Sequence, residues 1–133
     1  MRVILSTVAL TALLAVGSAF AAEQAKEVDD QTRARVLAEI ERYVTADVKL
    51  KRYFFLTDPR NDRTLRLTFD HVHEGVSAGD RNYAACVDFK DQAGKLYDVD
   101  IFVSLEEDRA QVEDIVLHKV EGNPIEKTAK KGK

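Results

Sequence analysis

The chain has little of several residue types, and each shortage narrows what the protein can be. Of its 133 residues, one is cysteine (Cys86) and none is tryptophan. A single cysteine cannot form an intramolecular disulfide, so the fold has to rest on packing alone. No hydrophobic run long enough to span a bilayer follows residue 22. The formal net charge of −3 provides no basic surface for phosphates, so we expect neither nucleic-acid binding nor docking on an anionic membrane.

The first 22 residues predict export. Arg2 supplies a positive start, an uncharged apolar or small-residue run covers 3–16, and residues 19–21 include the small side chains that a signal peptidase accepts. The run is too short to span a bilayer comfortably, because a spanning helix needs about 20 apolar residues. We therefore expect a signal peptide over 1–22 and a periplasmic or secreted protein.

The remaining chain predicts one domain over 23–120, since its size is that of a single domain and allows a core without cross-links. Residues 121–133 contain four lysines and few apolar side chains, which predicts a flexible basic tail. Cys86 is too far from the expected cleavage site to carry a lipid anchor. We therefore expect a soluble protein with no membrane contact after cleavage.

Apolar side chains recur at helical spacing near the start of this domain. Val36, Leu37, Ile40, Tyr43 and Val44 form a single stripe, with charged residues between them, which predicts an amphipathic helix over 30–45. An aspartate just before the stripe can accept the free N–H groups of the first turn. A helix with one apolar stripe needs a surface to lie on.

That surface is predicted by five segments with alternating apolar and polar residues. The expected strands are 48–57, 64–73, 82–90, 95–104 and 111–120. Short connections favour an antiparallel meander, because a parallel crossover needs a dozen residues or more. Alternation predicts one buried face and one wetter face. We therefore expect an α+β domain, in which one N-terminal helix packs on a four- to five-stranded antiparallel meander.

One helix followed by an antiparallel meander resembles the cystatin-like fold, in which a sheet wraps a helix. The resemblance is architectural and covers 30–120. The chain is also similar to small exported bacterial domains of this shape that carry no assigned activity. The motifs that make cystatins protease inhibitors are missing, since there is no Gln-x-Val-x-Gly loop and no Pro-Trp pair. The resemblance therefore implies a fold and no function.

His71 and His73 are the sharpest local feature. Residues i and i+2 of a strand point to the same side, so both imidazoles could converge on one metal ion, with His118 as a third ligand if it is near. Strand alternation opposes this three-histidine site, because His71 and His73 share the phase of Leu67 and Phe69, while His118 shares that of its own strand's apolar residues. The alternative is two solvated residues at a strand end. We expect no metal ion and no cofactor, with His71 and His73 as weak candidates.

Asp88, Asp98 and Asp100 form a second group of candidates. All three have the phase opposite to the apolar residues of their strands, and the short turn at 91–94 should bring Asp88 opposite or diagonal to Asp98. Crowded carboxylates repel one another, which can raise a pKa, attract a cation or support acid–base chemistry.

The alternative to a functional acidic face is a solvated one. Its acids would then pair with Lys49, Lys51 or Arg66 on other strands, which is the ordinary state of the polar side of a one-sided sheet.

Cys86 shares the phase of the aspartates. A thiol nucleophile needs a base or a positive field, and no Cys-His-Asn signature surrounds this residue. We expect a buried or half-buried structural thiol, with a disulfide-linked dimer as the alternative. Serine catalysis and a phosphate-binding glycine loop find no support either, so an enzyme is not favoured.

These patterns predict an exported small binding or interaction domain that is non-enzymatic and acts through its sheet. Its candidate binding residues are Asp88, Asp98, Asp100 and Arg66. The expected partner is an unknown protein or small ligand in the periplasm. Two alternatives stay open. One is a metal-binding protein or enzyme that uses His71, His73 and the acidic face, and the other is a homodimeric structural protein.

Overall fold

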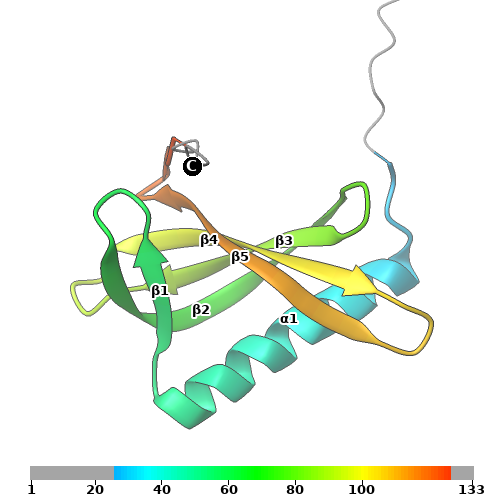
Figure 1. Cartoon of the computed structure of the whole chain (residues 1–133), viewed down its shortest axis with the longest axis horizontal. Helices are drawn as coiled ribbons and strands as arrows, with labels where there is room; N and C mark the ends of the chain where they lie inside the picture. The colour runs from blue at the N-terminus through cyan, green and yellow to red at the C-terminus, as the bar shows by residue number, and fades with distance from the viewer. Residues whose placement is uncertain (1–25, 127–133) are drawn as a thin grey trace, which may run out of the picture.

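A single helix lies against one antiparallel sheet (Figure 1). The structure is a computed structural model that describes residues 26–126. Helix α1 spans Asp30–Lys51 and precedes all of the strands. The strands are β1 Phe54–Asp58, β2 Arg63–Ala78, β3 Tyr83–Lys90, β4 Leu96–Leu105, β5 Ala110–Val120 and β6 Asn123–Pro124. They follow one another across the sheet in chain order. The predicted α+β fold with an antiparallel meander is therefore confirmed, with six strands in the described range in place of four or five.

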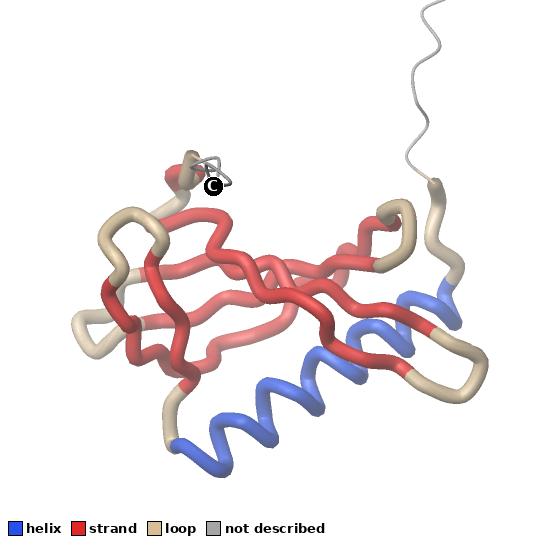
Figure 2. The backbone as a smooth tube through the Cα atoms, in the orientation of Figure 1, coloured by secondary structure: helices blue, strands red, loops and turns tan. Residues whose placement is uncertain are grey.

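The apolar stripe of α1 faces the sheet, as predicted. Val36, Ile40 and Val44 are fully buried, whereas Leu37 and Tyr43 of the same stripe are only partly buried. They share one core with inward-facing side chains of the central strands, namely Val87 and Phe89 of β3 and Val99, Ile101 and Val103 of β4. The helix starts after Asp29, whose carboxylate accepts the backbone N–H of Thr32 at 2.8 Å. Figure 2 shows α1 running along one side of the sheet, so the core lies between the two layers.

The carboxyl end of α1 extends into the segment that the alternation assigned to a strand. The expected strand over 48–57 is therefore wrong in its first part. The helix ends at Arg52, where a left-handed φ of 70° lets the backbone N–H reach the carbonyl of Val48. An ion pair between Asp47 and Lys51 (2.7 Å) lies on the last turn, where a positive charge also complements the helix dipole.

β2 is longer than expected, and its pairing with β3 is irregular. The register shifts between Phe69 and His71 and again between Val72 and Val76. Such shifts insert extra residues into one strand, so the side chains beyond them change faces. Gly75, which we expected in a loop, lies within the strand.

The predicted signal peptide over 1–22 lies outside the described residues, and so do residues 127–133 of the predicted tail. The start of that tail continues the sheet instead. β6 pairs with β5 after a turn in which Gly122 has a φ of 75°. The backbone N–H of Ile125 then donates to the carbonyl oxygen of His118 at 2.8 Å.

Candidate functional site

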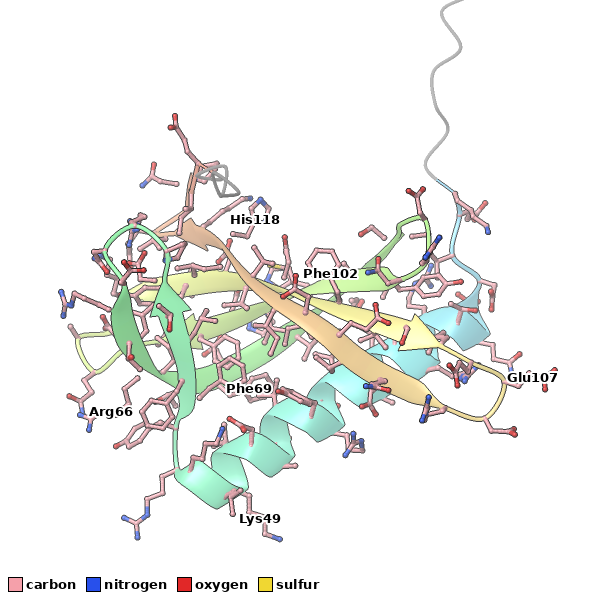
Figure 3. All side chains as sticks on the ribbon, in the orientation of Figure 1. Lys49, Arg66, Phe69, Phe102, Glu107 and His118 are labelled. Carbon is pink, nitrogen blue, oxygen red and sulfur yellow. The ribbon has the colours of Figure 1, made fainter. Side chains whose placement is uncertain are left out.

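In β4 the polar side chains alternate with the buried ones, so they lie on the side of the sheet that faces away from the core and α1. Figure 3 labels His118 and Phe102 among the side chains of this region. Asp88 of β3 lies directly opposite Asp98 of β4, as the short turn between these strands predicts, and Cys86 lies opposite Asp100. The residues between them, such as Val87, point into the core. We call this side of β2–β5 the polar face.

The two neighbouring histidines also lie on the polar face, which strand alternation did not predict. His71 pairs with Asp88 across β2 and β3, whereas Phe69 pairs with Phe89 and packs against the core. The register shift between Phe69 and His71 inserts one extra residue into β2, so the side chains after it point to the opposite side of the sheet. The expectation that His71 and His73 share a face with Phe69 is therefore wrong, and the reason is a bulge that depends on the partner strand.

Both imidazoles converge on the carboxylate of Asp88. His71 Nε2 lies 3.5 Å from Asp88 Oδ2, and His73 Nε2 lies 2.9 Å from Asp88 Oδ1. The two rings stack with their centroids 5.0 Å apart. The contact of His73 is short but is not a hydrogen bond, and Asp88 Oδ1 is a buried oxygen with no hydrogen-bond partner among the described residues. The distance alone therefore overstates how well this carboxylate is satisfied.

The orientation of His71 is set from its other side. Its Nδ1 lies 2.8 Å from Asp70 Oδ2, and Lys90 Nζ lies 3.0 Å from Asp70 Oδ1. Hydrogen bonds from His71 and Lys90 lower the pKa of the Asp70 carboxyl. An ionised Asp70 favours a proton on Nδ1 of His71, which leaves Nε2 directed at Asp88.

The carboxylates of Asp88 and Asp98 strain one another electrostatically. Partial burial, together with the neighbouring charge of Asp88, raises the pKa of Asp98. Lys119, which pairs with Asp98 on β5, and His73 act in the opposite direction. Lys119 and His73 therefore offset only part of the repulsion between the Asp88 and Asp98 carboxylates.

His118 does not join the other two histidines. Its Nδ1 lies 3.2 Å from Asp100 Oδ2. Among the described residues, three groups of side chains place potential metal-ligand atoms within 4.8 Å of one another. The groups are His71, His73 and Asp88; Cys86, Asp100 and His118; and Cys86, Asp88 and Asp98. A three-histidine site is not formed, whereas a site of two histidines and one carboxylate is brought together.

Cys86 is half-buried between the aspartates. Burial and the negative charges of Asp100, Asp98 and Asp88 raise the pKa of its thiol to about 12. At neutral pH the sulfur therefore stays protonated, which is the opposite of what a thiolate nucleophile requires. The half-buried state of Cys86 is as expected, and its structural role stays a prediction.

The basic residues that we considered as partners of the aspartates lie elsewhere. Lys51 pairs with Asp47 on α1, and Lys49 belongs to the same helix. Arg66 places its guanidinium carbon 4.9 Å from the centroid of the Tyr53 ring, which is a cation–π contact. In the part of the chain that the structure describes, no ion pair joins Arg66 to the aspartates, so it does not belong to their cluster.

Sequence reasoning missed an aromatic residue on the polar face. Two open hollows of about 480 Å³ and 420 Å³ share Asp100, Phe102 and His118 among their lining residues. Val116 and Ile125 add apolar surface to the second of them. The signal was available, because Phe102 stands at a position where the alternation of β4 requires a polar residue.

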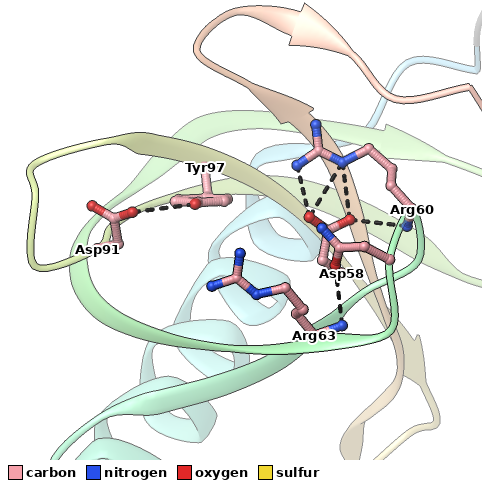
Figure 4. Close-up of polar contacts among 6 residues, drawn as sticks. Asp58, Arg60, Arg63, Asp91 and Tyr97 are labelled. Carbon is pink, nitrogen blue, oxygen red and sulfur yellow. Dashed lines mark hydrogen bonds and ion pairs between the residues drawn. The ribbon is translucent and has the colours of Figure 1, made fainter.

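A third hollow, of about 450 Å³, lies at the opposite end of β2 and has a different character (Figure 4). Asp58, at its edge, accepts hydrogen bonds from the backbone N–H and the guanidinium of Arg60. The Tyr97 hydroxyl donates to Asp91 at 3.2 Å. Asp58 is paired with Arg60 here, whereas Arg63, Arg66 and Lys95, which also line this hollow, form no ion pair among the described residues.

In the described range, we find no helix that combines the length and the apolar character needed to cross a membrane. Comparisons of the chain with protein-family models, with curated proteins and with solved structures give no match.

Proposed function

We propose that this chain is an exported, non-enzymatic binding domain that holds a cationic segment of a partner protein on its polar face. The observation that carries the proposal is the pair of hollows that meet at Asp100 and Phe102. A carboxylate and a half-buried aromatic ring lie next to each other there, on the side of the sheet away from α1. The signal-like residues 1–22 support export, and the helix with its meander supports a cystatin-like architecture.

The charges around the hollows favour a cationic partner. Asp100 and Asp114 line the hollows. Asp98 lies two positions before Asp100 on β4, where Lys119 of β5 faces it. Complementary charge across an interface guides encounter and excludes partners of the same sign. A lysine- or arginine-bearing segment is therefore preferred over an acidic one.

The apolar part of the hollows favours a partner that also carries apolar side chains. Phe102, Val116 and Ile125 are half-buried in the described structure and line the second hollow. Aromatic side chains with a polar rim are the usual centre of a binding surface. An extended basic segment with one or two apolar side chains therefore fits better than a purely polar ligand.

The protonated thiol of Cys86 supports a binding role over a catalytic one. Cys86 has a pKa of about 12, so it does not supply a thiolate at neutral pH. Arg66, which we expected among the binding residues, lies by Tyr53 and is not needed for this surface.

Selection from a library of displayed 12-residue peptides tests the proposal. We expect enriched peptides that combine lysine or arginine with apolar residues. Binding of the best peptide should be lost in the double variant Asp98→Asn with Asp100→Asn. The double variant Glu106→Gln with Glu107→Gln removes two acids from the turn after β4 and should bind normally. Enrichment of acidic or uncharged peptides, or equal binding by both double variants, would contradict the proposal. So would self-association of the protein through Phe102.

A further inference from the structure

A second cluster of side chains lies at the β2–β3 side of the polar face, at His71, His73 and Asp88. We infer that His71, His73 and Asp88 bind one divalent transition-metal ion of the zinc class. This inference does not rest on the proposed partner binding, because the hollows at Asp100 and Phe102 contain none of these three residues.

The first argument is the donor set. Two imidazole nitrogens and a carboxylate oxygen are ligands that zinc and its neighbours in the first transition row accept. The three ligand atoms already lie within 4.8 Å of one another. Zinc bonds of about 2.0–2.2 Å in a tetrahedral site require a ligand spacing of about 3.4 Å. The imidazoles of His71 and His73 are 56% and 45% exposed, so there is room around them for the small shift that brings the ligand atoms to this spacing.

The second argument is the outer support of His71. Histidines that bind metals almost always donate their other ring N–H to a carboxylate, a carbonyl or a water. His71 Nδ1 has such a partner in Asp70 at 2.8 Å, and Lys90 holds Asp70 in turn at 3.0 Å. The ring is therefore positioned with Nε2 directed at Asp88 before any ion binds.

The third argument is the unsatisfied oxygen of Asp88. This residue is 8% exposed, and its Oδ1 has no hydrogen-bond donor in the described range of the chain. Buried carboxylate oxygens are rarely left in this state, and an ion is one of the few groups that satisfies them. Asp98 directly opposite adds a second negative charge, so a cation at Asp88 relieves both.

The same donor set argues against calcium and magnesium. Calcium takes six to eight oxygen ligands, and magnesium keeps an octahedral shell of oxygens and waters. Two of the three donors here are imidazole nitrogens, which those ions bind poorly. The irregular pairing of β2, which brings both rings to Asp88, is the kind of device that often adjoins a site.

Zinc titration calorimetry tests the inference, with protein purified without a polyhistidine tag and treated with a chelator. The chain contains three histidines, so His118→Ala is a matched control for His71→Ala and His73→Ala. We expect one zinc ion per chain, and a loss of affinity in the His71 and His73 variants that exceeds the ~10–100-fold typical of an outer residue. His118→Ala should bind zinc as the unchanged protein does.

Two further measurements complete the test. Asp70→Asn should weaken zinc binding by about 10–100-fold, because it removes the group that orients His71, and calcium should give no binding heat. Absence of zinc binding in the unchanged protein would overturn the inference. So would zinc binding that His118→Ala abolishes and that His71→Ala and His73→Ala leave intact, since the ion would then lie at Cys86 and Asp100.

Discussion

Asp58 and Asp88 are both buried carboxylates, 2% and 8% exposed, and they are satisfied very differently. Asp58 accepts three well-placed N–H groups of Arg60 at 2.7–3.0 Å, and the side-chain hydrogen bonds of Arg60 lower the pKa of Asp58. Asp88 has an unsatisfied Oδ1 and faces a second carboxylate, Asp98. The difference teaches that burial alone does not assign a role to an acid. The hydrogen-bond donors around an acid assign its role, and the donors around Asp88 leave its Oδ1 open to a ligand.

The two sites also differ in where their partners come from. Arg60 is two residues from Asp58, in the same turn (Figure 4). The groups around Asp88 come from its two neighbouring strands, β2 and β4. A local pair stabilises one turn, whereas a cluster drawn from three strands depends on how those strands pair.

A substitution in the apolar core is the reference for both carboxylates. We expect it to cause the largest loss of stability. Ile40 is fully buried between α1 and the sheet. Truncation of a buried isoleucine typically costs about 2–5 kcal/mol, because apolar contact is lost and a cavity remains. Ile40→Ala should lower the midpoint of denaturant unfolding accordingly. An unchanged midpoint would show that α1 is not docked through this residue.

Asp58→Asn comes next. It removes a charged acceptor from a buried hydrogen-bonded pair, and hydrogen bonds to charged groups contribute about 1.5–3 kcal/mol. We expect a free energy of unfolding lower by about 1–3 kcal/mol at pH 7. Chemical denaturation of the variant and of the unchanged protein measures this difference.

The pH dependence of that difference has a definite sign. The pKa of Asp58 is lower in the folded state than its ordinary value of 3.8, so its contribution is present above that value. The contribution is lost as the pH falls from 3.8 through the folded pKa, because the carboxyl then takes up a proton. The two proteins should therefore converge in stability at acidic pH, and a constant difference down to pH 2 would contradict the role assigned to Asp58.

Asp88→Asn should have the smallest effect, although the substitution is chemically the same. The amide can donate to the neighbouring carboxylate of Asp98 and removes one of two repelling charges. Without metal we expect a change in unfolding free energy within about 1 kcal/mol. A loss as large as that of Asp58→Asn would show that Asp88 is a structural acid and would remove the comparison.

Much of the fold was predictable because apolar residues recur at regular spacing, every three or four residues in the helix and every second residue in the strands. The apolar stripe that includes Val36, Ile40 and Val44 predicted the docked side of α1, and the short turn at 91–94 predicted that Asp88 lies opposite or diagonal to Asp98.

What the sequence did not predict depends on the partner strand. The register shift after Phe69 moved His71 and His73 to the polar face, and no pattern within β2 contains that information. Phe102 was visible as an aromatic residue in a polar phase, although we did not weigh it. The extra helical turns up to Lys51 were hidden by the strand-like composition of the residues that follow.

The most direct test compares zinc-dependent stability in the unchanged protein, Asp58→Asn and Asp88→Asn, by thermal unfolding with and without zinc chloride. A ligand that binds only the folded state at 100 times its Kd stabilises it by about 2.7 kcal/mol. We expect zinc to raise the unfolding temperature of the unchanged protein and of Asp58→Asn by similar amounts, and to raise that of Asp88→Asn far less. If zinc has no effect, or stabilises all three proteins alike, Asp88 is not the ligand that its unsatisfied oxygen indicates.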